Sequence, residues 1–460
     1  MKFKKFILNG MFLVVTAIVT QTIGTMFRIY MSNTIGAKAI GLYQLIITVY
    51  AFAITTTVSG ITLLVTRLVS QSIALNKTNC IRYIVLKCTV IALIISLFTG
   101  GLLFFGSNFI AEHILCQKET ALPLKILAPS LPFISVSSSL RGYFSSVRQA
   151  YKSAIEQLLE QVTEISVFML LIGKFVTMGI EYSCCAIAIG STVSEIVTAL
   201  YSFILYRLDS RKYSESGRCS IRKSLYFIGI PVTLSSCLRS GLNIIENVTI
   251  PKGLRLYGKS SESALTDYGI IMGMVMPFIG FPAIVIYSFA TILIPEMSEV
   301  YERTDTKKIQ YIASNAVRIV LLFSLPLAVI LFFFGKEIGV FFYHNAETGR
   351  YIHIFSLIVP LIYLDKIVDS MLKGLNQQIA YLSYNIIDSV VSVIFVIVLI
   401  PRYGVFGLIV TMYFSTFINT GLSLLRLIKV TEIQIKALWI TAPLFISILL
   451  CYIIRMLFVV

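Results

Sequence analysis

The chain has few charged residues and lacks the clustered side chains on which metalloenzymes depend. Asp, Glu, Lys and Arg make up 13% of its 460 residues, whereas a water-soluble domain carries about 25%. Its three histidines are scattered, and none of its eight cysteines forms a C-x-x-C pair. The scarcity of charge excludes most soluble enzymes. The lack of ligand spacing predicts no metal site and no cofactor, and we expect the cysteines to pack as small hydrophobic residues.

Long polar intervals are also scarce, because apolar runs fill nearly the whole chain. A helix needs about 20 apolar residues to cross the hydrocarbon layer of a bilayer. Thirteen segments meet this condition, namely 6–32, 39–66, 83–107, 121–140, 153–177, 183–206, 222–249, 268–296, 313–337, 351–372, 380–400, 404–427 and 437–459. They are too long and continuous to be the alternating strands of a membrane barrel. The sequence therefore predicts an all-α integral membrane protein.

The basic residues gather in alternate intervals between the segments. One side of the predicted topology holds 22 of them and the other side nine. The positive-inside rule places the richer side, which includes the N-terminus with Lys2, Lys4 and Lys5, in the cytoplasm. This asymmetry explains the net charge of +16 without a nucleic-acid partner. The first apolar run has no A-x-A cleavage site, which predicts an uncleaved helix rather than a signal peptide.

A faint internal repeat has an offset near 230 residues. Arg141-Gly142 closes the fourth segment and Lys373-Gly374 closes the tenth, and Glu156 and Asp388 each follow fourteen residues after the glycine. We therefore predict an N-terminal six-helix lobe over 1–206, a cytoplasmic linker over 207–221, a C-terminal six-helix lobe over 222–428 and one extra transmembrane helix within 429–460. Parallel repeats of this kind are related by a pseudo-twofold axis along the membrane normal, with a substrate site between them.

Two arginines lie deep in predicted membrane segments. Arg28 is in segment one and Arg239 in segment seven, where Asn243 and Glu246 follow at i+4 and i+7 on the same helix face. A central charge costs about 2.5–3.5 kcal/mol on insertion scales, so intramembrane charges are functional candidates. Planar guanidinium groups suit phosphate oxygens. We predict that Arg28, Arg239, Asn243 and Glu246 bind an anionic substrate in a central cavity, with segments one and seven facing each other.

Five intramembrane acids are candidates for binding a coupling cation. They are Glu156, Glu160, Glu164, Asp365 and Asp369. The three glutamates share one face of segment five, at i, i+4 and i+8. Two structural alternatives stay open. Glu156 is close enough to the start of its segment to be hydrated at the interface, and the charges of segment ten could simply pair with one another.

Residues 253–260, Gly-Leu-Arg-Leu-Tyr-Gly-Lys-Ser, match the P-loop pattern literally. A P-loop works because a strand leads into a glycine-rich turn and then into a helix whose amides hold phosphate. Here a membrane helix precedes the match, and the predicted side is extracytoplasmic. We therefore predict an accidental match and no ATP as a partner.

Several motifs resemble polysaccharide flippases of the multidrug/oligosaccharidyl-lipid/polysaccharide exporter superfamily. The resemblance is carried by Phe27-Arg28, the stretch from Asn33 to Leu45, Arg141-Gly-Tyr-Phe144 with Glu160-Gln161, Ile230-Pro-Val-Thr233, the stretch from Tyr268 to Pro277, and Leu293-Ile-Pro-Glu-Met-Ser298. These motifs are specific for the superfamily and fit the branch of stage V sporulation protein B, which is related to the lipid II flippase.

The resemblance implies two six-helix lobes with alternating access in a bacterial cytoplasmic membrane, and a transporter rather than an enzyme. It implies an undecaprenyl-pyrophosphate-linked sugar as the substrate, for cell-wall, spore-cortex or surface polysaccharide assembly. The implied driving force is a proton, Na⁺ or the membrane potential. Arg28 matches the cavity arginine on the first helix of the related flippase. One helix follows the twelve-helix core here, where the lipid II flippase has two, so a lipid-tail groove built from those helices does not carry over.

Two other functions stay open. A cation-coupled multidrug exporter of the same superfamily would need an acidic pocket, which Glu160, Glu164 and Asp369 would supply. A membrane-embedded lipid-modifying enzyme would need paired catalytic carboxylates, a histidine cluster or metal-ligand spacing, and the sequence shows none of these.

Overall fold

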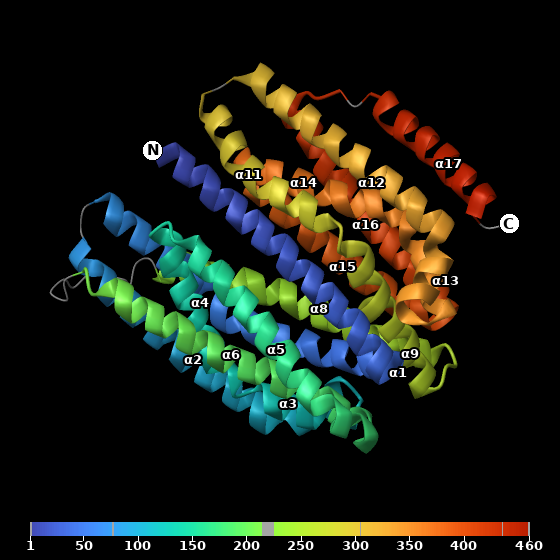
Figure 1. Cartoon of the computed structure of the whole chain (residues 1–460), viewed down its shortest axis with the longest axis horizontal. Coiled ribbons are helices and arrows are strands. Elements are labelled where there is room, and N and C mark those ends of the chain that lie inside the picture. The colour runs from blue at the N-terminus through green and yellow to red at the C-terminus, as the bar shows by residue number, and fades with distance from the viewer. Residues whose placement is uncertain (1, 76–77, 214–224, 304, 435, 459–460) are drawn as a thin grey trace. The chain divides into compact units, whose positions relative to one another are not determined.

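The computed structural model describes residues 2–75, 78–213, 225–303, 305–434 and 436–458, and helices are the only regular secondary structure in that part of the chain (Figure 1). Twelve helices there are long and apolar enough to cross a membrane, or up to 13 if one bent pair counts as a single span. The predicted all-α membrane fold is therefore confirmed. The predicted linker 207–221 falls largely outside the described residues.

The chain forms two compact units. The first comprises Met1–Phe27 and Thr34–Val248, and the second comprises Arg28–Asn33 and Thr249–Val460. The helices up to residue 256 are α1 (Lys2–Ala74), η1 (Thr78–Cys80), α2 (Ile81–Phe109), η2 (Ile110–Ile114), η3 (Lys118–Thr120), α3 (Ala121–Leu127), α4 (Ser130–Ser146), α5 (Ala150–Met178), α6 (Ile180–Ser210), η4 (Leu225–Gly229) and α8 (Ile230–Leu256). The rest are α9 (Ser261–Tyr268), η5 (Gly269–Val275), α10 (Met276–Gly280), α11 (Ala283–Glu302), α12 (Thr306–Tyr343), α13 (Ala346–Phe355), η6 (Ser356–Ile358), α14 (Val359–Gly374), α15 (Gln378–Tyr403), α16 (Val405–Thr431) and α17 (Leu438–Phe458).

Glycine and proline set the breaks within the long helices. Gly36 has φ 81° and ψ 165° and interrupts α1 between the first two predicted segments. Only glycine adopts such a conformation without strain. The fourth predicted segment bends by 48° between α3 and α4, just before Ser130. The eighth predicted segment, 268–296, was wrong in detail: it is divided between α10 and α11 at Pro282, since proline lacks the N–H of a helical hydrogen bond.

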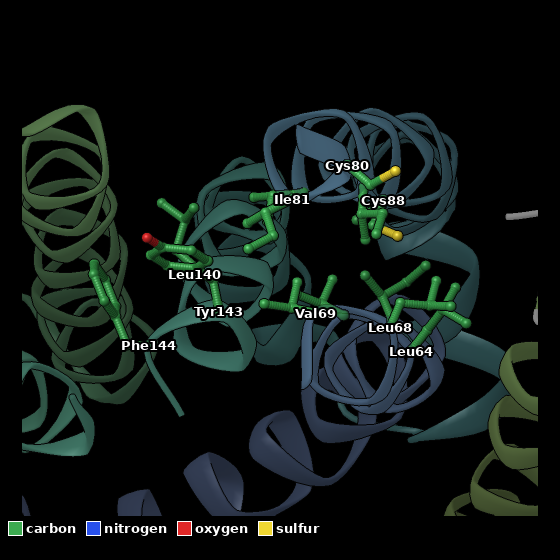
Figure 2. Packing of buried hydrophobic residues seen from close by; sticks show 14 residues of the cluster. Leu64, Leu68, Val69, Cys80, Ile81, Cys88, Leu140, Tyr143 and Phe144 are labelled. Carbon is green, nitrogen blue, oxygen red and sulfur yellow. The ribbon is translucent and has the colours of Figure 1, made fainter. Parts of the chain in front are cut away.

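A hydrophobic cluster joins the C-terminal half of α1 to α2 and α4 (Figure 2). Leu64, Leu68 and Val69 of α1 lie against Ile81 of α2 and Tyr143 of α4, and each of these side chains is at least nine-tenths buried. Apolar side chains gain little by leaving lipid for protein, so helices in a membrane associate through close packing. Gly142 shows this closeness, because a Cβ there would lie 2.9 Å from the carbonyl oxygen of Thr62.

The two units repeat the same local features. Thr66 Oγ1 donates to Gly142 O at 3.3 Å, and Ser298 Oγ donates to Gly374 O at 3.0 Å. The two bonds are 232 residues apart along the chain, the offset that the Arg141-Gly142 and Lys373-Gly374 motifs suggested. The turns agree as well: residues with positive φ recur in matching turns, at Cys116 and His344, Arg148 and Asn376, and Gly179 and Gly404. In each unit the carbonyl group of the motif glycine therefore bonds to a neighbouring helix, which is α1 for Gly142 and α11 for Gly374.

Most of the described cysteines are free. Cys88, Cys184, Cys185 and Cys451 are free and buried, which fits the expectation for small hydrophobic residues. Cys80 is the exception, because it takes part in a disulfide.

Candidate functional site

Arg141, at the end of α4, is the centre of a buried ionic cluster in the first unit. Its Nε donates to Glu156 Oε1 at 2.9 Å and its Nη2 donates to Glu160 Oε2 at 3.3 Å. The Glu156 side chain has no solvent exposure. The alternative that Glu156 is hydrated at the membrane interface was therefore wrong. A guanidinium with two donor edges is suited to hold two carboxylates that a helix turn brings to one face.

Two further glutamates surround this cluster and leave it acidic. Glu195 of α6 interacts electrostatically with Glu156, Glu160, Glu164 and Arg141. The Oε2 atom of Glu195 is buried without a hydrogen-bond partner. The same is true of Glu156 Oε2. Ser202 lies near Glu156, but not in hydrogen-bonding geometry. A buried acceptor without a donor is costly. One arginine faces several carboxylates here, so a proton or a small cation would complete the balance of charge.

A cavity opens beside Arg141 within the same unit. Its volume is about 310 Å³, and it is lined by Thr16, Ala17, Thr62, Thr66, Arg141, Gly142, Ser145, Ser153, Ala154 and Gln157. Hydroxyl and amide groups predominate among its polar lining, and these groups bind water or a hydrated cation readily. The cavity gives the ionic cluster a polar neighbour in the first unit.

Asp209, at the end of α6, shows how a purely structural acid differs. It accepts from Tyr143 Oη at 2.5 Å and from Gln149 Nε2 at 3.4 Å, and it pairs with Lys152 at 3.7 Å and Lys212 at 2.7 Å. Its hydrogen bond raises the pKa of the Lys212 ammonium group. With four partners, this carboxylate has little capacity left for a coupling ion.

The sequence repeat paired the wrong acids. The fourteen-residue spacing equated Glu156 with Asp388, but hydrogen bonds equate Asp388 with Glu164. Ser191 Oγ donates to Glu164 Oε1 at 2.6 Å, and Ser415 Oγ donates to Asp388 Oδ1. Both serines lie 27 residues after their acid. Gly374 is the last residue of α14, whereas α4 continues for four residues beyond Gly142, so the following helix begins four residues nearer to the glycine in the second unit.

A second acidic cluster lies between α14 and α16 in the second unit. Asn419 Nδ2 donates to Asp365 Oδ1 at 3.1 Å, and Ser423 Oγ donates to Asp369 Oδ1 at 3.4 Å. Both pairs are 54 residues apart, so they form successive rungs between two helices that run in the same direction. Asn419 Oδ1 is buried without a partner and adds an oxygen to the two carboxylates. Carboxylate, amide and hydroxyl oxygens together suit a hard cation or a proton.

The charges of segment ten pair with one another only in part. Lys366 Nζ lies 3.4 Å from Asp365 Oδ2. Lys373 instead places its Nζ 4.2 Å from the centroid of the Tyr381 ring, a cation–π contact. Asp369 has no direct ion pair among the residues that the structure describes, although Lys366 and Lys373 both act on it electrostatically.

The predicted substrate residues lie on exposed helix faces. Arg28 on α1 and Arg239 and Asn243 on α8 are exposed, and Glu246 is half-buried. Asn243 accepts from Asn247 Nδ2 at 2.7 Å through its Oδ1. Within the described chain neither arginine has an acidic ion-pair partner. Arg28 acts electrostatically on the Tyr343 hydroxyl. That Arg28 and Arg239 face each other stays a prediction.

The P-loop match takes up a helix-to-helix turn. Gly253 lies within α8, Gly258 has φ 108°, and Ser260 is the N-cap of α9 through a hydrogen bond to the Ser263 amide. No strand precedes it. Lys259 Nζ pairs with the largely buried Asp267, so this lysine is held by the chain itself.

Sequence reasoning missed the partners that complete both clusters. Arg141 was noted only for the repeat and the family resemblance, and Asn419 and Ser423 not at all. The i, i+4 spacing of Asn419 and Ser423 matches that of Asp365 and Asp369, and this shared spacing is the signal that could have linked α16 to α14.

Comparison with known proteins agrees with this architecture. A model of the family described as polysaccharide biosynthesis protein matches residues 7–252, more than half of the chain, and a MatE model matches residues 231–398. Stage V sporulation protein B of Bacillus subtilis (strain 168) is 26% identical over 441 residues, covering 94% of this chain and 85% of that protein. The probable lipid II flippase MurJ of Rickettsia prowazekii (strain Madrid E) is 24% identical over 351 residues, covering 72% of this chain and 66% of that protein.

Solved structures share the fold at low identity. A multidrug resistance MATE family transporter of the MOP superfamily, inward-facing, has a TM-score of 0.70 at 14% identity and covers 91% of this chain and 99% of its own. The lipid II flippase MurJ, in an inward closed conformation, has a TM-score of 0.67 at 15% identity, and the match covers 97% of this chain and 98% of that structure's chain. The chain is therefore a membrane transporter rather than an enzyme, and it belongs to the polysaccharide biosynthesis protein family of the MOP superfamily.

Proposed function

We propose that this transporter is a flippase for polyprenyl-pyrophosphate-linked sugars, working by alternating access in a bacterial cytoplasmic membrane with its N-terminus in the cytoplasm. One relative supports the substrate class, since it is named as a probable lipid II flippase. The orientation rests on the excess of basic residues on the predicted cytoplasmic side.

The observation that carries the proposal is the pair of deep arginines without acidic partners. Arg28 and Arg239 are both exposed on membrane-spanning helices, and no described acid forms an ion pair with either. A pyrophosphate cannot enter hydrocarbon unpaired, because an isolated ion is very costly there. Guanidinium groups in a hydrated cavity would offset that cost and bind phosphate oxygens through two donors each.

The two acidic clusters supply the driving force in this proposal. A ligand shifts a conformational equilibrium only by binding one state more tightly than the other. The cluster around Arg141 holds more acid than base, and the cluster of Asp365, Asp369 and Asn419 holds one aspartate without a direct ion pair among the described residues. Each cluster also has an unpartnered buried oxygen. Protons or Na⁺ ions that bind there in one state only would couple the ion gradient or the membrane potential to substrate movement.

A reconstituted flipping assay tests the substrate class. Proteoliposomes that contain the purified full chain are loaded with fluorescent lipid II, a fluorescent lipid-linked oligosaccharide or a cationic dye, with protein-free vesicles as the control. Movement of a pyrophosphate lipid under an imposed ion gradient supports the flippase. Movement of the dye alone overturns it.

A cation-coupled multidrug exporter is the second candidate. The MatE match over residues 231–398 contains Asp365 and Asp369, and a cationic drug would be attracted to such carboxylates. The exposed Arg28 and Arg239 argue against it, because guanidinium groups without acidic partners among the described residues would repel a cationic ligand.

A further inference from the structure

A cationic pocket lies where α12 and α13 meet, at one end of their spans. It has a volume of about 410 Å³ and is lined by Lys336, Val340, Ala346, Arg350, His353 and Ile354. Lys336 and Val340 belong to the last two turns of α12, and Ala346 and Arg350 to the first two turns of α13. The pocket is therefore near the level at which lipid headgroups meet the hydrocarbon.

Close helix packing holds the two cations on the same pocket. A Cβ on Gly349 would lie 2.5 Å from the carbonyl oxygen of Lys336, and a Cβ on Gly339 would lie 2.2 Å from Gly349 Cα. The backbones of α12 and α13 are thus in direct contact beside Arg350. Small residues at such crossings fix the relative position of membrane helices.

The two cations are available to a ligand. Lys336 and Arg350 are exposed, and neither has an ion-pair partner among the described residues. Glu337 and Glu347, also exposed, are close in sequence but do not line the pocket. The His353 side chain, which lines the pocket, is held in place because its Nδ1 donates to the carbonyl oxygen of Phe332 at 2.5 Å.

An apolar groove of about 370 Å³ lies deeper in the same unit. It is lined by Leu361, Ile409, Val410, Tyr413, Phe414 and Phe417, with no charged residue. Phe414 is 44% exposed and Phe417 64% exposed. In a membrane span, exposed aromatic side chains of this kind contact lipid. The α16 residues of the groove extend over about 12 Å at 1.5 Å per residue.

One hydrogen bond joins the pocket to the groove. Tyr413 Oη donates to the carbonyl oxygen of Ile354 at 2.5 Å. Tyr413 lines the groove and Ile354 lines the pocket. The cationic pocket and the apolar groove are therefore adjacent on one unit, and the pocket is at the end of the spans.

We propose that this surface binds a glycerophospholipid with an anionic phosphate headgroup, such as phosphatidylglycerol. Lys336 and Arg350 bind the phosphate, and one acyl chain follows the groove to Phe417. A groove of about 12 Å matches an acyl chain within one leaflet, whose hydrocarbon is about 15 Å thick. A soluble phosphate would leave the groove empty. The site shares no residue with the proposed transport residues and does not depend on the substrate.

The headgroup arm of the test uses delipidated full-length protein in detergent. Its melting temperature is measured against added phosphatidylglycerol or phosphatidylcholine with the same chains, because a ligand that binds the folded state raises stability by mass action. We expect phosphatidylglycerol to bind at least about tenfold more tightly than phosphatidylcholine. Both lipids offer a phosphate to Lys336 and Arg350, but the choline cation of phosphatidylcholine would be repelled by these side chains. The double variant Lys336→Gln/Arg350→Gln should abolish this preference. The Arg402→Gln variant, an exposed cation outside the pocket, should retain it.

The tail arm identifies the occupant. Phe417→Gln should weaken binding of long-chain phosphatidylglycerol, whereas Leu425→Gln, which replaces an exposed apolar residue of α16 outside the groove, should not. Glycerol 3-phosphate should fail to compete. The proposal is overturned if phosphatidylcholine binds equally well, if the double variant keeps the preference, if glycerol 3-phosphate competes, or if a polyprenyl phosphate displaces phosphatidylglycerol at equal mole fraction.

Discussion

Arg141 Nε lies 2.9 Å from Oε1 of Glu156, a carboxylate with no solvent exposure. The contact ties the end of α4 to the start of α5, and Arg141 also reaches Glu160 on the next turn. Without the guanidinium, a buried carboxylate would have to take up a proton or remain uncompensated. The arginine therefore has a structural role and also sets the charge of the acidic cluster around it.

Arg141→Ala should lower the stability of the protein strongly. Removing one partner of a buried ion pair costs about 3–5 kcal/mol. Arg141→Lys should recover only part of this stability, because an ammonium group lacks the planar donor geometry with which a guanidinium group binds two carboxylates. Thermal melting of the purified protein measures the effect. The exposed Arg211→Ala is the matched control, and equal melting temperatures for the two alanine variants would rule out the stabilising role.

Neutralising the coupling acids should stop transport without unfolding the protein. We expect this for at least one of Glu156→Gln, Glu160→Gln, Glu164→Gln, Asp365→Asn and Asp369→Asn, because an amide of the same shape binds neither a proton nor a cation in exchange. Ion-driven uptake in proteoliposomes is the measurement. Asp209→Asn is the control, since that acid already has four partners and should affect stability more than coupling. If all five variants transport normally, the membrane potential acting on an anionic substrate is the driving force.

Hydrophobic length alone predicted the helices well. Most apolar runs became spans, because a membrane leaves the backbone no alternative to internal hydrogen bonding. Hydropathy kept 268–296 as one segment, because it does not tell whether a proline such as Pro282 bends a helix or divides it. The positions of the intramembrane charges were also readable, since such residues are rare in apolar segments.

The partners of those charges could not be read from the sequence. Arg141 and Glu156 are 15 residues apart on different helices, and Asp365 and Asn419 are 54 apart. Which helices touch depends on packing between distant segments, where apolar sequences look alike. The Glu156–Asp388 equivalence failed for a related reason, because α14 ends at Gly374 while α4 continues past Gly142, and this changes the number of residues between the glycine and the next helix.

Lys259 should matter for stability and not for nucleotide binding. Lys259→Ala leaves Asp267, which is 6% exposed, without its ion-pair partner, and should therefore lower the melting temperature. The double variant Lys259→Ala/Asp267→Asn should regain much of that loss and transport normally without ATP. Loss of transport in a double variant that melts like the wild type would instead assign the lysine a role in the cycle.

Labelling of single cysteines should place Lys212 and Ser261 on opposite sides of the membrane. Both positions are exposed and flank α8. In a background without other cysteines, Ser261→Cys should react with an impermeant maleimide in intact cells, and Lys212→Cys only after permeabilisation. The reverse pattern would invert the proposed topology, in which basic residues favour the cytoplasmic side.

Arg28 should be the most sensitive substrate contact. Arg28→Ala should abolish flipping of a pyrophosphate-linked glycan, and Arg28→Lys should restore it only in part, because lysine keeps the charge but loses the two-pronged contact with phosphate oxygens. Arg239→Ala should weaken binding of the pyrophosphate lipid more than binding of a neutral lipid of the same chain length. The controls are the exposed cations Lys87→Ala and Arg402→Ala, which lie outside the proposed site and should leave flipping unchanged. Both substrate arginines are exposed, so their variants should melt like the wild type, which separates loss of binding from loss of fold. If Arg28→Ala binds and flips lipid-linked glycans as well as the wild type, the anionic substrate is wrong and a cation-coupled drug exporter becomes the better account of the acidic clusters.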